Sequence, residues 1–112
     1  MLMPPLTHLQ FAVIDTIGAS EKSGAEIRDL LKRRHKISKT LSGFYMFMKR
    51  LEDADLITGR YEIIEVAGYK AKERHYKVTG HGFKSWEKTR DFYIEAGREW
   101  AAARGTRTVS CD

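Results

Sequence analysis

Apolar residues recur three or four positions apart in the first part of the chain and predict helices there. In LTHLQFAVIDTIG, Leu9, Val13 and Ile17 lie on one face of a helix. Thr7 stands where its hydroxyl would cap the first turn, and Gly18 stands where such a helix would end. The segment therefore predicts a first helix with one broad apolar face.

A second, shorter helix is predicted in SEKSGAEIRDLLKRRHK, where Ile27 and Leu31 share one side. Three consecutive cations, Lys32–Arg34, close this segment and complement the negative end of a helix dipole. Lys36 and Lys39 follow beyond that end, so stabilisation of the helix does not account for them.

The stretch TLSGFYMFMKRLEDADLI, from Thr40 to Ile57, predicts a third helix with Thr40 as its N-cap. A helix in so small a protein cannot bury all of its sides, so the unbroken apolar row in its middle must divide between two surfaces. Tyr45 falls at the edge between these surfaces and Phe47 on the outer flank. The predicted inward residues are Leu41, Phe44, Met48 and Leu51, and the predicted outward residues are Ser42, Gly43, Met46, Lys49 and Arg50.

Two strands and a long helix are predicted after the third helix. Residues 57–66 and 72–79 are rich in β-branched and aromatic residues, and the intervening AGYKA contains a glycine suited to a hairpin turn. From Thr79 to Gly105 the chain has no proline, and large residues step three and four positions along one face. Residues 106–112 are expected to form a flexible tail.

Three helices, a two-stranded hairpin and a long last helix are the layout of a winged helix-turn-helix domain. The expected fold class is mainly α with a small β-hairpin. We assign residues 1–79 to a winged-helix DNA-binding domain, residues 80–105 to a C-terminal dimerisation helix and residues 106–112 to the tail.

Composition narrows the classes of protein that this sequence fits. Its 112 residues suit one domain, and its single cysteine, Cys111, gives no disulfide framework. The first residues do not resemble a signal peptide and no apolar run approaches the length of a membrane span, so we expect a cytoplasmic protein without a membrane partner. The four histidines have no metal-ligand spacing, and nucleophile and phosphate-loop motifs are missing. We therefore expect no enzyme, no metal and no cofactor.

The positive charge is concentrated in two parts of the sequence. The formal net charge is +5, and every charged residue from Lys32 to Arg50 is a lysine or arginine. A second basic cluster runs from Lys70 to Lys77 and is interrupted only by Glu73. Solvated helix faces usually mix both signs, so two basic clusters indicate a polyanionic partner, and we expect double-stranded DNA.

In a helix-turn-helix, the third helix of this layout enters the major groove while flanking cations hold phosphates. Ser42 would hydrogen-bond to a base edge, Gly43 would permit close approach, and Met46 would touch a thymine methyl group. Alternatively, Ser42 and Gly43 only solvate a first turn, and Lys49 or Arg50 pairs with nearby carboxylates. The predicted DNA-binding residues are Arg33, Arg34, Lys36, Lys39, Thr40, Ser42, Gly43, Tyr45, Met46, Lys49, Arg50, Lys70, Lys72 and Arg74.

Three blocks of this sequence, GAEIRDLL, GFYMFMKRLEDADLI and ERHYKVTGHGFKSW, resemble the PadR family of winged-helix transcriptional regulators. The resemblance implies a homodimer that binds palindromic promoter DNA, usually as a repressor, with the last helix at the dimer interface. It also implies that Tyr45 touches DNA. The chain departs from the family at Asp55, where a glycine is usual after the third helix. The matching positions are Gly24, Phe44, Tyr45, Arg50, Leu51, Glu52, Arg74, Tyr76, Thr79 and Gly82.

The last helix suggests a dimer independently of the family, because its aromatic stripe would be exposed on a lone chain. Two alternatives remain: the stripe packs on the first helix of its own chain, or the dimer encloses a cavity at Trp86 and Trp100 for a planar apolar effector. The predicted interface residues are Phe83, Trp86, Arg90, Tyr93, Gly97 and Trp100.

A protein-binding adaptor is the rival to a DNA-binding regulator, because winged helices serve both purposes. In that case a protein partner would cover Met46 and Phe47, which lie outward on the third helix.

Overall fold

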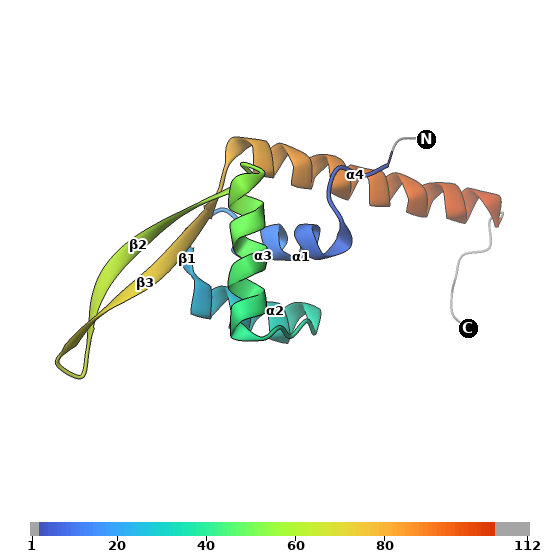
Figure 1. Ribbon diagram of the computed structural model, residues 1–112. Helices are drawn as coiled ribbons and strands as arrows, with labels where there is room; N and C mark the ends of the chain where they lie inside the picture. The colour runs from blue at the N-terminus through green and yellow to red at the C-terminus, as the bar shows by residue number, and fades with distance from the viewer. Residues whose placement is uncertain (1–2, 105–112) are drawn as a thin grey trace.

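The computed structural model describes residues 3–104 and contains the expected succession of helices and hairpin (Figure 1). The winged-helix class predicted from the sequence is confirmed, and the cysteine and the predicted tail at 106–112 lie outside the described residues. One strand of two residues, β1, was not predicted because it is too short to carry a pattern. The elements are α1 His8–Ile17, β1 Lys22–Ser23, α2 Gly24–His35, α3 Leu41–Asp53, β2 Ile57–Val66, β3 Tyr69–Val78 and α4 Gly80–Ala103.

Side-chain caps explain where the four described helices begin. In each case a hydroxyl just before the helix accepts a hydrogen bond from the backbone N–H three residues on, which satisfies one of the free N–H groups of the first turn. The predicted caps of α1 and α3 are confirmed. The capping residues are Thr7, Ser23, Thr40 and Thr79.

The prediction for the end of α3 is wrong by four residues, because the helix stops at Asp53 instead of continuing to Ile57. Asp55 has a φ of 61°, in the left-handed region, where aspartate is better tolerated than most side chains. The backbone N–H of Leu56 then donates to the carbonyl of Leu51 at 3.0 Å. This reversal turns Leu56 and Ile57 into the core, where 5% and 1% of each remain exposed.

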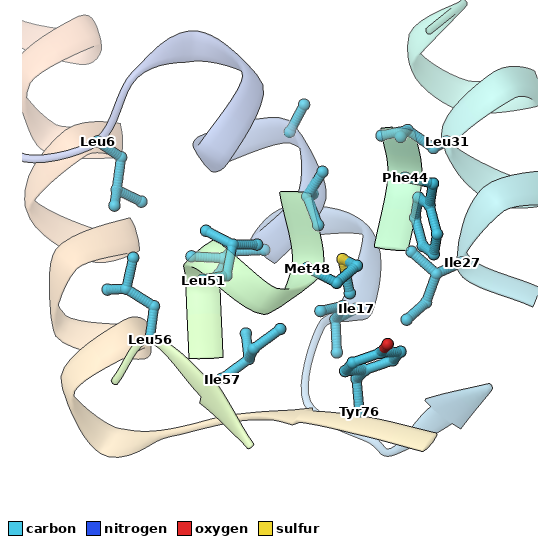
Figure 2. Close-up of a cluster of buried hydrophobic side chains, with 13 residues drawn as sticks. Leu6, Ile17, Ile27, Leu31, Phe44, Met48, Leu51, Leu56, Ile57 and Tyr76 are labelled. Carbon is cyan, nitrogen blue, oxygen red and sulfur yellow. The ribbon is translucent and has the colours of Figure 1, made fainter. Parts of the chain in front are cut away.

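The core lies among α1, α2, α3 and the base of the hairpin, and Figure 2 shows side chains from all of these elements meeting. The predicted inward residues Phe44, Met48 and Leu51 are buried. Leu41 is a correction, since it is 56% exposed: the buried stripe of α3 starts one turn later, at Phe44. The buried apolar residues are Leu6, Ala12, Val13, Ile14, Ile17, Ile27, Leu31, Phe44, Met48, Leu51, Leu56, Ile57 and Tyr76.

The sheet has the order β1–β3–β2, and its two long strands form a wing that extends away from the helices (Figure 1). Their register runs from Ile57 opposite Val78 to Val66 opposite Tyr69. The turn contains two residues, Ala67 and Gly68, whose φ angles are 53° and 85°. The second strand therefore begins three residues earlier than predicted, because a two-residue turn with positive φ angles joins twisted strands closely.

The face of α4 that packs on the rest of the chain differs from the predicted aromatic stripe. Its buried residues are the small Gly82, Ser85 and Thr89. A Cβ atom on Gly82 would overlap the carbonyl oxygen of Leu56, so only glycine permits this contact. The hydroxyl of Thr89 accepts a hydrogen bond from the backbone N–H of Leu6 at 3.2 Å.

The predicted stripe lies beside this face and is divided between two environments. Trp86 is partly buried and stacks on Phe11 of α1 with 6.0 Å between ring centroids. Phe83, Tyr93 and Trp100 stay 53%, 46% and 61% exposed. Packing on the first helix, one of the two alternatives, thus applies to Trp86 and in part to Tyr93, whose ring meets Phe11 edge-on with 6.3 Å between centroids, but not to Phe83 or Trp100. None of the helices in residues 3–104 is long and apolar enough to cross a membrane.

Candidate nucleic-acid interface

The outward side of α3 carries the residues that the helical spacing predicts. Ser42, Met46, Lys49 and Arg50 are all exposed, and Met46 is 59% exposed. This side is continuous with solvent from the first turn of the helix to its last. It therefore presents a hydroxyl, a thioether and two cations along one helical surface of the size that enters a major groove.

Thr40 and Gly43 have a structural role at the start of α3. The Thr40 hydroxyl accepts a hydrogen bond from the Gly43 backbone N–H at 3.1 Å. A Cβ atom on Gly43 would lie 2.9 Å from that hydroxyl oxygen. The glycine is thus explained by the capping turn itself, while the predicted role of both residues in contacting DNA stays a prediction.

Tyr45 lies between the core and the outer surface, as its place in the helix predicts. Tyr45 is 37% exposed, and its ring packs edge-on against Phe44 with 5.1 Å between centroids. A Cβ atom on Gly24, at the start of α2, would lie 2.6 Å from the Tyr45 hydroxyl oxygen. The glycine that opens α2 therefore makes room for this tyrosine and sets the position of its hydroxyl group.

Phe47 is less exposed than its predicted position on the outer flank implies. It is partly buried and packs against the core, and the ammonium group of Lys39 lies 5.5 Å from its ring centroid. Of the pair Met46 and Phe47, only Met46 is a largely exposed apolar side chain.

Some predicted cations form surface ion pairs. Arg33 pairs with Asp29 at 2.7 Å and Lys49 with Asp53 at 3.3 Å, while Arg34 lies 3.9 Å from Asp15. Pairs this exposed contribute about 0–1 kcal/mol and exchange readily for other partners. Within residues 3–104, no ion pair engages Lys36, Lys39, Arg50, Lys70 or Lys72.

A groove of about 640 Å³ separates α3 from the wing. Lys49 lines it from the helix and Lys72 from the wing strand β3, so that one exposed ammonium group stands on each wall. Three tyrosine rings, from Tyr45, Tyr61 and Tyr76, form the rest of the lining together with Glu52 and Arg74. Cations and hydroxyl groups that line a groove from two sides suit a phosphate backbone.

Tyr61 was not predicted as a site residue. The cross-strand register places it opposite Arg74, on the side of the wing that turns toward α3. The guanidinium carbon of Arg74 lies 4.5 Å from the centroid of the Tyr61 ring, and the ammonium nitrogen of Lys72 lies 5.6 Å from it. Alternation along β2 could have revealed this placement, but only if the register with β3 were known.

Arg74 is held more tightly than the other predicted cations. Its Nη2 donates to Glu52 Oε1 of α3 at 2.6 Å, and the two side chains are 23% and 21% exposed. Beneath it, Tyr76 is 2% exposed, and burial, with a smaller contribution from Glu52, raises the pKa of its phenol to about 12. Arg74 therefore joins the wing to α3, and its predicted contact with DNA stays a prediction.

The opposite side of the wing base carries charges of both signs. Arg60 donates to Glu21 at 2.5 and 2.8 Å and to Glu62 at 3.0 Å, and its hydrogen bond lowers the pKa of the Glu21 carboxyl. His75 lies 2.8 Å from Glu73. This network links the wing to the segment between α1 and α2. The groove on the α3 side also contains a carboxylate, Glu52, but this pairs with Arg74, and Lys72 has no ion-pair partner among the described residues.

A smaller depression of about 250 Å³ lies between α2 and α3. Arg28, Lys32 and Lys39 line it, and the Arg28 guanidinium carbon lies 5.9 Å from the ring centroid of Phe44. Arg28 and Lys32 were not among the predicted DNA-binding residues. Lys32 was accounted for as a helix-end cation, and the proximity of Arg28 to α3 follows only from how the two helices cross.

A pocket of about 380 Å³ lies between the end of α1 and the start of α4. Ile14, Val78, Phe83 and Trp86 line it with Asp15, and the indole N–H of Trp86 is buried without a hydrogen-bond partner among the described residues. The predicted effector cavity at Trp86 and Trp100 differs from this pocket, because Trp100 does not line it. In residues 3–104 no cluster of side chains could hold a metal ion.

Comparison with solved structures identifies the fold. A PadR-like transcription factor from Bacteroides fragilis matches with a TM-score of 0.68 at 19% identity, over 85% of this chain and 88% of that one. A PadR family transcription regulator from Clostridium difficile R20291 matches with a TM-score of 0.68 at 19% identity, over 88% of this chain and 100% of that one. The resemblance inferred from three sequence blocks is thus confirmed in three dimensions.

A third match is a Bacillus subtilis PadR solved in complex with operator DNA. It has 26% identity and a TM-score of 0.62 over 79% of this chain, which spans about half (49%) of that protein. No protein-family model and no curated protein sequence matches the chain. The chain has the winged-helix fold of PadR-family transcription regulators.

Proposed function

We propose that this chain, which has the winged-helix fold of the PadR regulators, binds double-stranded DNA in a sequence-specific manner and regulates transcription. The observation that carries the proposal is the groove between α3 and the wing, with Lys49 on one wall and Lys72 on the other beside the exposed outer face of α3. The operator complex of the Bacillus subtilis relative supports it.

In this proposal the outer face of α3 lies in the major groove. Ser42 and Met46 face base edges, where a hydroxyl hydrogen-bonds and a thioether contacts a thymine methyl group. The adjacent phosphate backbone lies in the groove between α3 and the wing, against Lys49, Lys72 and the hydroxyl of Tyr45. The predicted cations of the α2–α3 turn, Arg33, Arg34, Lys36 and Lys39, together with Arg50 and Lys70, hold flanking phosphates.

We further propose that the active form is a homodimer that represses transcription by occupying a palindromic promoter site. The exposed aromatic residues of α4 support a dimer, because a two-fold partner would remove them from water. A two-fold protein reads an inverted repeat, whose half-sites lie about one helical turn apart. The role as a repressor rests on the resemblance to the PadR family.

The test is selection from a pool of random DNA duplexes by the purified protein at two salt concentrations, followed by sequencing of the retained DNA. We expect an inverted repeat to be enriched. On that operator, Met46→Ala should relax specificity at one position, and Lys49→Ala should weaken all sequences evenly and reduce the salt slope by about 1. Lys88→Ala, an exposed site on α4, is the matched control and should change neither property.

Retention that disappears at modest salt and enriches no sequence would contradict the proposal. In that outcome the basic surface is only a charged surface, and Met46 becomes the point at which to search for a protein partner. The adaptor alternative would then be tested by the effect of Met46→Ala on protein binding instead of DNA binding.

A further inference from the structure

We infer that Arg74 is a positioning residue: its ion pair with Glu52 sets the angle of the wing to α3, and it does not bind a phosphate. This inference rests on the proposed DNA-binding function. It reverses the role that the sequence suggests, where Arg74 is one cation in a basic cluster.

The contacts of Arg74 hold its guanidinium group in place on several sides. A Cβ atom on Gly59, the β2 residue below it, would lie 2.8 Å from two of its nitrogen atoms. The rings of Tyr61 and Tyr76 lie 4.5 and 5.8 Å from its guanidinium carbon. Glu52 at the end of α3 completes the arrangement. A planar guanidinium group packed on rings and paired with a carboxylate keeps a fixed geometry, as a flexible ammonium group does not.

The presence of an acidic residue, Glu52, in this groove is best explained by a structural role. Its carboxylate lines the groove that would receive a phosphate backbone, and an unpaired negative charge there would repel DNA. Arg74 neutralises it at 2.6 Å. The pair therefore adds no net charge to the groove, so its contribution to DNA binding must come from the geometry that it maintains.

The outer half of the wing has few contacts that could fix its angle, whereas the base is held by pairing of β3 with β1 and by the buried Ile57 and Tyr76. Across residues 63–72, which form its outer half, the described chain shows no ion pair or side-chain hydrogen bond to another element. Lys70 and Lys72 lie on this outer half. Their position relative to α3 depends on the wing base, where β3 pairs with β1. At this base Arg74 links the wing to α3, and Arg60, paired with Glu21, links it to the segment before α2.

Two neutralising substitutions one residue apart on α3 test the inference. Asp53→Asn removes a carboxylate that pairs with the exposed Lys49, so it should leave DNA affinity unchanged or raise it. Glu52→Gln removes the same charge but releases the wing, and we expect it to weaken operator binding by about fivefold or more as the wing lysines lose their phosphates. Stronger binding by Glu52→Gln would mean that the freed Arg74 is a phosphate ligand, and would overturn the inference.

A double substitution checks that Arg74 acts through Glu52. If it does, Glu52→Gln combined with Arg74→Gln should bind operator DNA no more weakly than Arg74→Gln alone. An additional loss in the double variant would show an independent contact of each residue and would contradict the pairing. Melting temperatures of all variants identify any that are simply unfolded.

A measurement without DNA separates this inference from the proposed function. Spin labels are attached to two introduced cysteines, Glu26→Cys on α2 and Glu65→Cys on the wing, in a protein that also carries Cys111→Ser. Dilution with unlabelled protein ensures that the measured distance reports the wing angle within one protomer. We expect Glu52→Gln to broaden or shift the distance distribution and Asp53→Asn to leave it unchanged. An unchanged distance distribution in Glu52→Gln would refute the positioning role. Failure of the wild-type protein and of every variant to bind DNA would refute the proposed function alone.

Discussion

At the scale of single residues, Gly24 and Tyr45 depend on each other. The Tyr45 ring occupies the space that a Cβ atom on Gly24 would fill. Because this ring is partly exposed and free to turn away, Gly24→Ala should cost at most about 1 kcal/mol of stability but displace the hydroxyl from the groove. We expect a clear loss of operator affinity with little change in melting temperature.

The matched control is Gly80→Ala, at the first position of α4, where a Cβ atom would meet no atom within 4 Å. It should change neither stability nor affinity appreciably. Equal losses of affinity in both variants would mean that the space at Gly24 is not what positions Tyr45.

Because of the Tyr76 phenol, the stability of the folded protein depends on pH in the alkaline range. Burial raises its pKa to about 12, above the ordinary value of 10.0, so the folded state favours the neutral form. Its contribution to stability is complete below pH 10 and is lost as the pH rises toward 12, with a magnitude of about 2–3 kcal/mol. Tyr76→Phe should remove this part of the slope, measured as the free energy of unfolding in urea between pH 8 and pH 12.

The free energies of unfolding of the wild type and of Tyr76→Phe should therefore converge or cross as the pH rises, since only the wild type has an ionisable group on this buried ring. Parallel curves across the whole range would contradict the assignment of the raised pKa to Tyr76.

At the scale of elements, the wing turn contains one residue that is poorly suited to its backbone. Ala67 has a φ of 53°, in the left-handed region, which costs a residue with a Cβ atom roughly 1 kcal/mol. Ala67→Asn should relieve part of this cost, because asparagine followed by glycine favours a two-residue hairpin turn. We expect greater protection of wing amides in hydrogen exchange.

The neighbouring position supplies the opposite change. Gly68 has a φ of 85°, so Gly68→Ala should reduce the protection of the same amides. The exchange of core amides in α1 and α3 should be unaffected in both variants. If the two variants changed the wing in the same direction, strain in the turn would not be the cause.

Much of the element order was predictable because local chemistry marks it. Hydroxyl caps and apolar spacing identify the helices, and β-branched runs identify the wing strands. The end of α3 was missed because Asp55 stands where the family resemblance implies a glycine, and only the structure shows that this aspartate adopts the left-handed backbone angle that ends the helix. The inner face of α4 was missed because it is made of small residues, and hydrophobic spacing finds large ones.

The same limit applies to the candidate site. Outward residues of α3 could be assigned from helical spacing alone, since they depend on one element. The groove needs α3 and the wing together, so Tyr61 was missed and the pairing of Arg74 with Glu52 was not foreseen. Side chains that act between elements become visible only when the register and the packing of those elements are known.

At the scale of the whole molecule, the chain is elongated, measuring 63 × 32 × 23 Å, with the wing and α4 extending in different directions from the core (Figure 1). The outer turns of α4 carry the exposed Trp100, which contacts only Arg104 among the described aromatic and cationic partners. Trp100→Glu should therefore leave the fold intact and weaken a dimer by at least about tenfold. Sedimentation velocity over a range of concentrations measures this.

Ala102→Glu, on the opposite side of the same turns, introduces the same charge and should not change the association state. If both variants sediment like wild type, α4 is not the dimer interface at this position, and the exposed aromatic residues need another explanation.

The hydrogen bond from the Leu6 amide to Thr89 and the stacking of Phe11 on Trp86 join two parts of the chain that are synthesised at different times. On the ribosome, α1 emerges before α4, and the side of α1 that packs on α4 has no partner until α4 has been synthesised. During that interval the apolar side of α1 is open to chaperones and to other nascent chains. Ribosome pausing between the wing and α4 would lengthen this exposure and lower the yield of folded protein, although it changes no residue.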